Sequence, residues 1–257
     1  MINNKYKFER YLNSGNFGSV IQCSYNNKKY AVKCDNDSKL LKYEANIYKE
    51  LRSVYQISKL VDFFLYDKKY YMVLDLFELT LADFKERTFN TQYYQDKLII
   101  IIKKVINILR DIHNCGIVHR DLKPPNICLN NNLEPYIIDF GMAKKIRINK
   151  KHIEEKTINN IIGSPNYVSL NVVNLIEPTM RDDVESIIYI IMFMILKNDV
   201  YINYTNNTLY IQKSISKISE VLLKNYVNMK LIDILIYIRR LKFSQTPNYE
   251  YIKSLII

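Results

Sequence analysis

The sequence predicts an α+β fold in which strands occupy the first part of the chain and helices most of the remainder. Short apolar runs bounded by polar turn residues are typical of strands, and they recur up to about residue 77. Beyond that point apolar residues recur at steps of three and four, which is the helical period. The 257 residues suffice for one large domain or for two lobes around a cleft.

Composition narrows the class of protein before any motif is considered. Hydrophobic residues make up 48% of the chain and charged residues 25%, as in ordinary globular proteins. With only 5 Gly and 6 Pro, no flexible linker is expected. The longest apolar run, residues 187–196, is too short to span a bilayer as a helix, so it predicts a buried core helix. Residues 1–10 are polar and charged and are not expected to act as a signal peptide.

Cysteine usage and charge bear on compartment and partners. Four cysteines (Cys23, Cys34, Cys115 and Cys128) are scattered without C-x-x-C spacing, which predicts reduced thiols in an intracellular protein. The net charge of +11 would attract nucleic acid, acidic protein or phosphorylated protein, although a solvated lysine-rich surface is the plainer interpretation. Heavy use of Asn, Ile, Lys and Tyr indicates an AT-rich genome, such as that of a large DNA virus or a protist.

The run L-N-S-G-N-F-G-S-V at residues 12–20 is the first candidate site. Close approach of backbone N–H groups to a phosphate requires positions without a Cβ atom, and Gly15 and Gly18 supply them. Asn13 tolerates positive φ better than most residues do. On its own the pattern fits a plain hairpin turn equally well. The candidate nucleotide-contacting residues are Leu12, Asn13, Ser14, Gly15, Asn16, Phe17, Gly18, Ser19 and Val20.

Residues 30–34 predict the following strand, in which alternation places Ala31 and Lys33 on one face. A small residue beside a lysine suits a surface that faces a flat base and its phosphates. The alternative is a solvated lysine on an edge strand.

Residues 38–52 predict a helix. One stripe of this helix consists of Leu40, Glu44, Ile47 and Leu51. A carboxylate among apolar neighbours needs a partner, because burying an unpaired charge is costly. Lys33 is the candidate partner of Glu44, and the alternative is an exposed Glu44 at the rim of the stripe.

Three further segments complete the outline. Residues 70–77 predict an apolar strand, and residues 95–115 predict a long amphipathic helix that ends at Gly116. His113 on that helix is expected to be structural rather than catalytic. Residues 198–217 are polar and contain several asparagines, so a surface loop is expected there.

The central motif is H-R-D-L-K-P-P-N at residues 119–126, which D-F-G follows at residues 139–141. Between them two short apolar runs flank an asparagine-rich turn, which predicts a hairpin. Such a hairpin would gather Asp121, Asn126 and Asp139 around one small volume. Together with Lys123, these side chains could hold a metal-bound phosphate beside a hydroxyl group.

This spacing resembles the catalytic loop and metal-binding turn of protein kinases. The run at residues 12–20 similarly resembles the kinase glycine-rich loop, with Asn13 in place of the first glycine. Ser-Leu-Asn stands where most kinases carry A-P-E, R-D-D-x-E-S follows, and the chain ends on R-x-L-x-F and P-x-Y-x-Y patterns. These features are similar to the casein kinase I family and the vaccinia-related kinases.

The resemblance runs from Leu12 to about Leu255. It implies one protein kinase domain over residues 1–257, with a small β-rich N-lobe of about residues 1–77 and a larger, mostly helical C-lobe of about residues 78–257.

For the chemistry, the resemblance implies a serine/threonine kinase that transfers the γ-phosphoryl group of ATP with Mg²⁺, or with Mn²⁺ in its place. Asp121 would orient the substrate hydroxyl and accept its proton. Lys123 would neutralise charge on the transferred group. Asn126 and Asp139 would hold the metal.

The resemblance also assigns the nucleotide side of the cleft. Lys33, fixed by Glu44, would grip the α- and β-phosphates. Leu74 would lie at the gatekeeper position, and the backbone that follows would hydrogen-bond the adenine. The implied adenine-side residues are Ala31, Leu74, Asp75 and Phe77.

Two residues outside these motifs are expected to support them. Ser164 would hydrogen-bond to Asp121 and Lys123. Asp183 would tie the backbone of the catalytic loop to the core helix.

The expected partners are protein substrates. The basic residues of segment 144–156, together with Arg181, favour acidic or already phosphorylated ones. Nucleic-acid contact rests on charge alone, because no recognisable binding motif is present. No membrane span is expected, which predicts a soluble intracellular protein, in the host cytoplasm or the virion if viral. The alternative function is a pseudokinase scaffold that binds nucleotide or protein without catalysis, and the Asn13 substitution is its only support.

Overall fold

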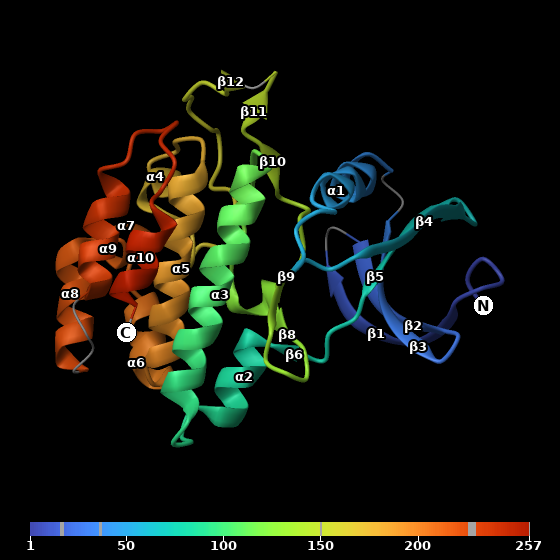
Figure 1. The fold of residues 1–257 in the computed structure, drawn as a ribbon, viewed down its shortest axis with the longest axis horizontal. Coiled ribbons are helices and arrows are strands. Elements are labelled where there is room, and N and C mark those ends of the chain that lie inside the picture. The colour runs from blue at the N-terminus through green and yellow to red at the C-terminus, as the bar shows by residue number, and fades with distance from the viewer. Residues whose placement is uncertain (16–17, 36–37, 150, 226–229, 257) are drawn as a thin grey trace.

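The computed structural model describes residues 1–15, 18–35, 38–149, 151–225 and 230–256. It has two lobes, with the N-terminal sheet in blue and the later helices in green to red (Figure 1). The N-terminal lobe is a five-stranded antiparallel sheet in the order β1-β2-β3-β5-β4, and helix α1 packs against it. Its elements are β1 (Lys7–Gly15), β2 (Gly18–Tyr25), β3 (Lys28–Asp35), α1 (Ser38–Glu50), β4 (Leu60–Tyr66) and β5 (Lys69–Asp75).

The C-terminal lobe is mostly helical, and α3 and α5 run side by side through its centre (Figure 1). Its helices are α2 (Leu81–Thr88), α3 (Tyr94–Asn114), η1 (Pro124–Asn126), α4 (Leu170–Val173), α5 (Met180–Ile195), α6 (Asn198–Thr205), α7 (Leu209–Gln212), α8 (Ile215–Lys224), α9 (Lys230–Arg239) and α10 (Tyr249–Leu255). Its strands are β6 (Leu79–Thr80), β7 (Ile117–Val118), β8 (Ile127–Leu129), β9 (Pro135–Ile137), β10 (Lys144–Lys145), β11 (Arg147–Ile148) and β12 (Lys151–His152). The predicted two-lobed α+β fold is confirmed.

Strand β3 follows the predicted alternation. Tyr30 and Val32 are buried in a small core of their own with Val73. Ala31 and Lys33 are half-buried. Because successive strand residues point to opposite faces, Lys33 is directed away from that core.

Helix α1 forms where it was expected, but its buried stripe was predicted one residue out at its start. Leu40 is 52% exposed, whereas Leu41 is buried. Glu44 and Ile47 lie on the buried face as predicted. Leu40 and Leu41 both lie within one helical turn of Glu44, so the period alone did not separate them.

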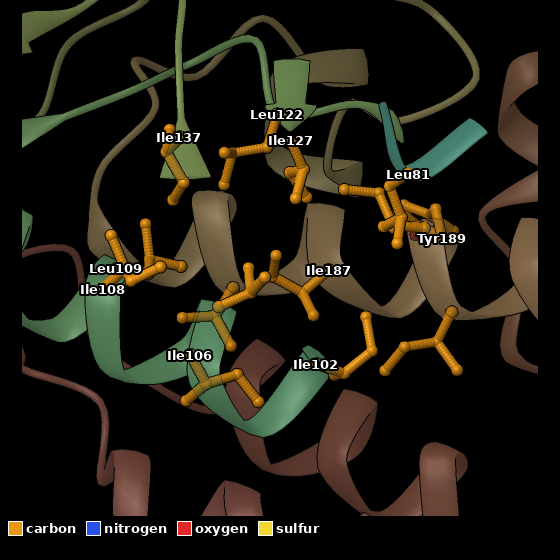
Figure 2. Packing of buried hydrophobic residues seen from close by; sticks show 14 of the residues in the cluster. Leu81, Ile102, Ile106, Ile108, Leu109, Leu122, Ile127, Ile137, Ile187 and Tyr189 are labelled. Carbon is orange, nitrogen blue, oxygen red and sulfur yellow. The ribbon is translucent and has the colours of Figure 1, made fainter. Parts of the chain in front are cut away.

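The main core lies between α3 and α5. Figure 2 shows Ile102, Ile106 and Leu109 on α3 and Ile187 on α5 as parts of one buried cluster. Almost every residue of α5 is buried, which confirms the core helix expected from the apolar run. No helix in the described part of the chain is both long and apolar enough to cross a membrane.

The expectation of a surface loop over residues 198–217 is wrong. The segment forms α6, α7 and the first turn of α8. Tyr201 and Tyr204 are buried, and the Tyr204 hydroxyl donates to the carbonyl of Gln212 at 2.6 Å. Gln212 in turn donates through Nε2 to the carbonyls of Thr205 and Asn207. These contacts order a segment whose asparagines suggest a loop.

Candidate active site

A cleft of about 550 Å³ lies between the N-terminal sheet, α1 and the loops of the C-terminal lobe. Most of the predicted chemistry-bearing side chains reach it from elements far apart in the sequence. Those that line it are Ser19, Val20, Lys33, Glu44, Asp121, Lys123, Asp139 and Ser164. The cleft therefore brings the residues predicted to bind phosphate together with those predicted to act on the hydroxyl group.

Lys33 links the two lobes. Its Nζ lies 2.6 Å from Glu44 Oε1 on α1 and 2.6 Å from Asp139 Oδ1 in the C-terminal lobe. Burial disfavours the ammonium, but the two carboxylates outweigh it and raise the pKa of Lys33. Burial also works against the carboxylate of Asp139, yet Lys33 outweighs it and lowers that pKa. The predicted pairing of Lys33 with Glu44 is present. Lys33 and Asp139 are held in charged form, whereas burial raises the pKa of Glu44 and Lys33 only partly offsets this.

The backbone at Asp139 is held in the left-handed region, with φ of 67°. The Tyr48 hydroxyl accepts a hydrogen bond from the Asp139 N–H at 3.1 Å. Phe140 is fully buried between the rings of Tyr48 and His119. The left-handed backbone conformation of Asp139 is costly for a residue other than glycine. It persists because the contacts around it impose it. Tyr48 lies one helical turn after Glu44, and no motif in the sequence indicates its contact with Asp139.

Asp121 is held by four donors. Its Oδ1 accepts from the Ser164 N–H at 2.8 Å and from Ser164 Oγ at 2.7 Å. Its Oδ2 accepts from Lys123 Nζ at 2.8 Å and more weakly from Asn126 Nδ2 at 3.4 Å. Lys123 also reaches Ser164 Oγ at 3.1 Å. The contacts expected of Ser164 are therefore present, and the carboxylate is fixed in one orientation.

Asn126 and Asp139 were predicted to hold a metal, and their chemistry fits that role. Asn126 Nδ2 donates to the Asp121 carbonyl at 2.9 Å, which turns the amide oxygen the other way. Within the described residues, no group of three or more His, Cys, Asp or Glu side chains could hold a metal by itself. One carboxylate and one amide oxygen suit Mg²⁺, which typically takes its remaining ligands from substrate phosphates and water.

Asp183 ties the catalytic loop to the start of α5. It accepts hydrogen bonds from the N–H groups of His119 at 2.7 Å and of Arg120 at 2.9 Å. His113 Nε2 lies 2.9 Å from the same carboxylate, and His113 Nδ1 contacts the Tyr249 hydroxyl. These contacts match the roles expected of Asp183 and of His113. Burial works against the Asp183 carboxylate, but its bonds from His113 and the loop lower its pKa.

The glycine-containing hairpin is described in part. Its backbone pairs Asn13 with Val20 and Gly15 with Gly18 across β1 and β2. Ser14 pairs with Ser19 in the same ladder. The predictions on Asn16 and Phe17 lie outside the described residues. Leu12 is 37% exposed on β1.

The adenine-side residues lie on β3, on β5 and just after β5. Ala31 pairs with Leu74 across β3 and β5, and Leu74 is buried. Asp75 and Phe77 instead line a separate pocket of about 430 Å³, and Phe77 packs on Tyr136 with ring centroids 4.6 Å apart. The cleft that contains Lys33 is not lined by these four residues or by Leu12.

The Ser-Leu-Asn segment at residues 169–171, which stands in place of A-P-E, is anchored on α5 through Glu185. Glu185 on α5 accepts from the Leu170 N–H at 3.1 Å and from Arg239 Nη2 at 2.6 Å. The Tyr189 hydroxyl donates to the same carboxylate oxygen at 2.6 Å. This buried network was missed because its members are far apart in sequence. The R-D-D-x-E-S motif contains Glu185 but does not indicate its partners.

Several of the basic residues expected to attract acidic substrates form ion pairs or hydrogen bonds within this chain. Lys144 lies 2.8 Å from the buried Glu177, and Lys156 lies 4.0 Å from it. Arg120 of the catalytic loop, which was not among the predicted residues, lies 3.2 Å from the same glutamate. Arg181 is 8% exposed and donates to the Leu241 carbonyl at 2.6 Å. The expectation that Arg181 contacts substrates therefore conflicts with its burial.

Comparison with known proteins gives a consistent result. A family model described as the protein kinase domain matches residues 6–245. A probable casein kinase I homolog from Encephalitozoon cuniculi (strain GB-M1) is 30% identical over 267 residues, covering 98% of this chain and 83% of that protein. The structure of vaccinia related kinase 3 has a similar fold, with a TM-score of 0.75 and 16% identity, covering 98% of this chain and 85% of that one. The expected viral source finds no support in these relatives.

Proposed function

The chain belongs to the protein kinase family, within its casein kinase I group, and from that premise we propose how its residues phosphorylate serine and threonine hydroxyls of proteins. One observation carries the proposal: Asp121 and Lys123 line the same cleft as the triad of Lys33, Glu44 and Asp139. One end of that cleft can hold nucleotide phosphates while the other receives a hydroxyl group.

Asp121 is the group that orients the acceptor hydroxyl and takes its proton. Ser164 and Lys123 aim its carboxylate into the cleft, so little reorganisation is needed when substrate binds. Lys123, whose side chain is 28% exposed, places its positive charge where the transferred phosphoryl group would pass. In this mechanism positioning and charge stabilisation provide the acceleration, because the phosphoryl group undergoes little covalent chemistry with the protein.

The nucleotide in this proposal is ATP. Lys33 binds its α- and β-phosphates, and Glu44 keeps the ammonium in place. Asn126 and Asp139 hold Mg²⁺, or Mn²⁺ in its place. The metal, when bound, neutralises charge on the phosphates. The backbone of β1 and β2 covers the phosphates, and Ala31, Leu74 and the residues that follow adjoin the base.

Acidic or phosphorylated proteins are the substrate class that the net charge of +11 favours. Lys144 and Lys156 are the basic residues that carry this part of the proposal, and Glu177 neutralises part of their charge. Nucleic-acid contact has only the net charge to support it.

Replacement of Asp121 by Asn tests the proposal. We expect Asp121→Asn to lower the transfer of radiolabelled phosphate to protein by about a thousandfold, because the proton acceptor is lost. ATP affinity should stay nearly unchanged, because Asp121 does not bind the nucleotide. The matched control is Asp111→Asn, which alters a half-exposed aspartate at the end of α3 and should keep full activity.

The same two proteins, applied to a dephosphorylated lysate and a peptide array, would identify the substrates. Undiminished transfer by Asp121→Asn would remove this residue from the mechanism. No transfer by the wild-type protein would instead favour a scaffold that binds nucleotide without catalysis. A preference for basic flanking residues would contradict the acidic substrate class.

A further inference from the structure

Lys213 is a fully buried lysine at the junction of α7 and α8, with 0% exposure. Its Nζ donates to the backbone carbonyl of Asn166 at 2.7 Å and lies 3.5 Å from the centre of the Tyr189 ring. Lysine is almost never fully buried unless it is paired, because the loss of hydration of an ammonium is costly. Burial accordingly lowers the pKa of Lys213 to about 7. A position that incurs this cost calls for an explanation beyond packing.

The carbonyl that Lys213 holds is close to the proposed site of chemistry. Asn166 lies two residues after Ser164, whose N–H and hydroxyl both donate to Asp121. The turn between them is closed by the Tyr167 N–H, which donates to the Ser164 carbonyl at 2.9 Å. A shift of the backbone at Asn166 would therefore move Ser164 relative to Asp121.

The chain from Asn166 to Leu170 is held at its other end by helix α5. The Leu170 N–H donates to Glu185, and the Tyr189 hydroxyl donates to the same carboxylate. Tyr189 thus contacts Lys213 through its ring and Glu185 through its hydroxyl. The backbone between Asn166 and Leu170 is consequently held at one end by Lys213, which contacts Tyr189 on α5, and at the other end by Glu185 on α5.

Lys213 is itself held in position. Its neighbour Gln212 accepts from Tyr204 and donates to the carbonyls of Thr205 and Asn207. These bonds fix the end of α7 relative to α6. The lysine is therefore pre-organised to reach Asn166, and this arrangement would be unnecessary for a side chain that only fills space.

We propose that Lys213 is a positioning residue for protein phosphorylation, which holds residues 163–170 in the conformation that presents a polypeptide substrate to Asp121. The inference rests on the proposed function, since it presumes that Asp121 receives the hydroxyl proton. Lys213 itself touches neither nucleotide nor substrate. Its removal should impair use of the polypeptide substrate and leave the nucleotide site intact.

Lys213→Met tests this role, because it keeps the length and apolar stem while it removes the charge and the donor. We expect KM for a peptide substrate to rise and kcat/KM to fall by about tenfold, because small displacements of positioning groups have effects of this size or larger. The dissociation constant of ATP should stay within about twofold of the wild-type value. The midpoint of thermal unfolding should be unchanged or raised, because a buried charge is replaced by an apolar group.

The matched control is Lys224→Met on α8, where the side chain is 71% exposed and pairs with Glu220. It should leave all three measurements unchanged. Lys213→Gln restores a hydrogen-bond donor without the charge. Its KM for the peptide should lie between those of Lys213→Met and the wild type.

Unaltered peptide kinetics in Lys213→Met would overturn the inference. A parallel loss of peptide use, ATP affinity and thermal stability in both the Met and Gln variants would also overturn it, because that pattern marks a purely structural residue. Activity retained by Asp121→Asn in the same assay would refute the proposed function instead. Abolished activity there, with unaltered Lys213→Met kinetics, would refute only the role of Lys213.

Discussion

At the scale of single residues, buried charges in this molecule are matched to specific partners. Lys33 faces two carboxylates within 2.6 Å, whereas Lys213 faces a carbonyl and an aromatic ring. The direction of each pKa shift reflects this difference, because carboxylates stabilise the ammonium of Lys33 and burial disfavours that of Lys213. The first arrangement suits a residue that must remain charged to bind phosphate. The second is an energetic cost that a positioning role would explain.

The Lys213 pKa leads to a prediction on pH. Burial lowers this pKa to about 7 in the folded chain, against 10.5 for an ordinary lysine, while Glu185 raises it and Arg239 lowers it. The Tyr189 ring, whose centre lies 3.5 Å from Lys213 Nζ, is a further titratable neighbour. Between these two pH values the unfolded chain binds a proton that the folded chain does not, so wild-type stability should rise with pH there. The stability advantage of Lys213→Met should therefore be largest at or below about pH 7 and shrink at higher pH.

Thermal unfolding of both proteins from about pH 6 to about pH 9.5 would measure this difference. Lys224→Met should follow the wild-type curve throughout. A gap between wild type and Lys213→Met that does not vary with pH would show that Lys213 does not titrate in this range.

At the scale of elements, α5 acts as the base on which the loops of the C-terminal lobe are fixed. Its first turn holds the catalytic loop through Asp183, and its next turn holds the segment at Leu170 through Glu185. The helix is apolar over most of its length and packs against α3, so these carboxylates are carried on a rigid support (Figure 2). A site built on such a helix keeps its geometry better than one built on loops alone.

Asp183→Asn should test this dependence of the loop on the helix. The substitution keeps the shape but turns one of the two acceptor oxygens into an NH2 group, so one of the backbone N–H groups of His119 and Arg120 loses its acceptor. The remaining bonds, including the contact with His113, lose their charged partner. We expect a loss of about 3 kcal/mol in the free energy of unfolding, together with a marked fall in kcat. Urea denaturation and initial-rate kinetics would measure the two effects. Full activity with normal stability would show that the loop holds its shape without Asp183.

At the scale of the whole molecule, charged side chains from both lobes meet at the cleft. Lys33 and Glu44 come from the N-terminal lobe and Asp139 from the C-terminal lobe. A nucleotide bound with its metal would contact both lobes at once. Ligands that bind only the folded state stabilise it by mass action. A nucleotide bound in the cleft should therefore raise the midpoint of thermal unfolding.

ATP with Mg²⁺ should raise the unfolding midpoint by about 5 °C at a concentration near a hundred times its dissociation constant. Lys33→Met and Asp139→Asn should each lose most of this rise, as should wild-type protein with EDTA. Lys224→Met is again the matched control and should keep it. An undiminished shift in both cleft variants would place the nucleotide elsewhere.

Much of the fold and of the candidate site could be read from the sequence because it is encoded locally. The helical period over residues 95–115 and the alternation around Lys33 are properties of neighbouring residues, and the spacing from Asp121 to Asp139 needs only a hairpin. Motif spacing of this kind also carried the family, which the comparisons established. The helices α6 and α7 were missed because their order comes from buried tyrosines and side-chain bonds to distant carbonyls.

The sequence by itself predicted the family, the two-lobed fold and the residues that we propose carry the chemistry. Only the tertiary structure decided how those residues are held: that Tyr48 restrains Asp139, that Glu185 replaces the missing anchor, and that Lys213 reaches Asn166 from the interior. The physical reason is that burial, and with it the strength and the cost of each charge, depends on contacts between segments remote in the chain.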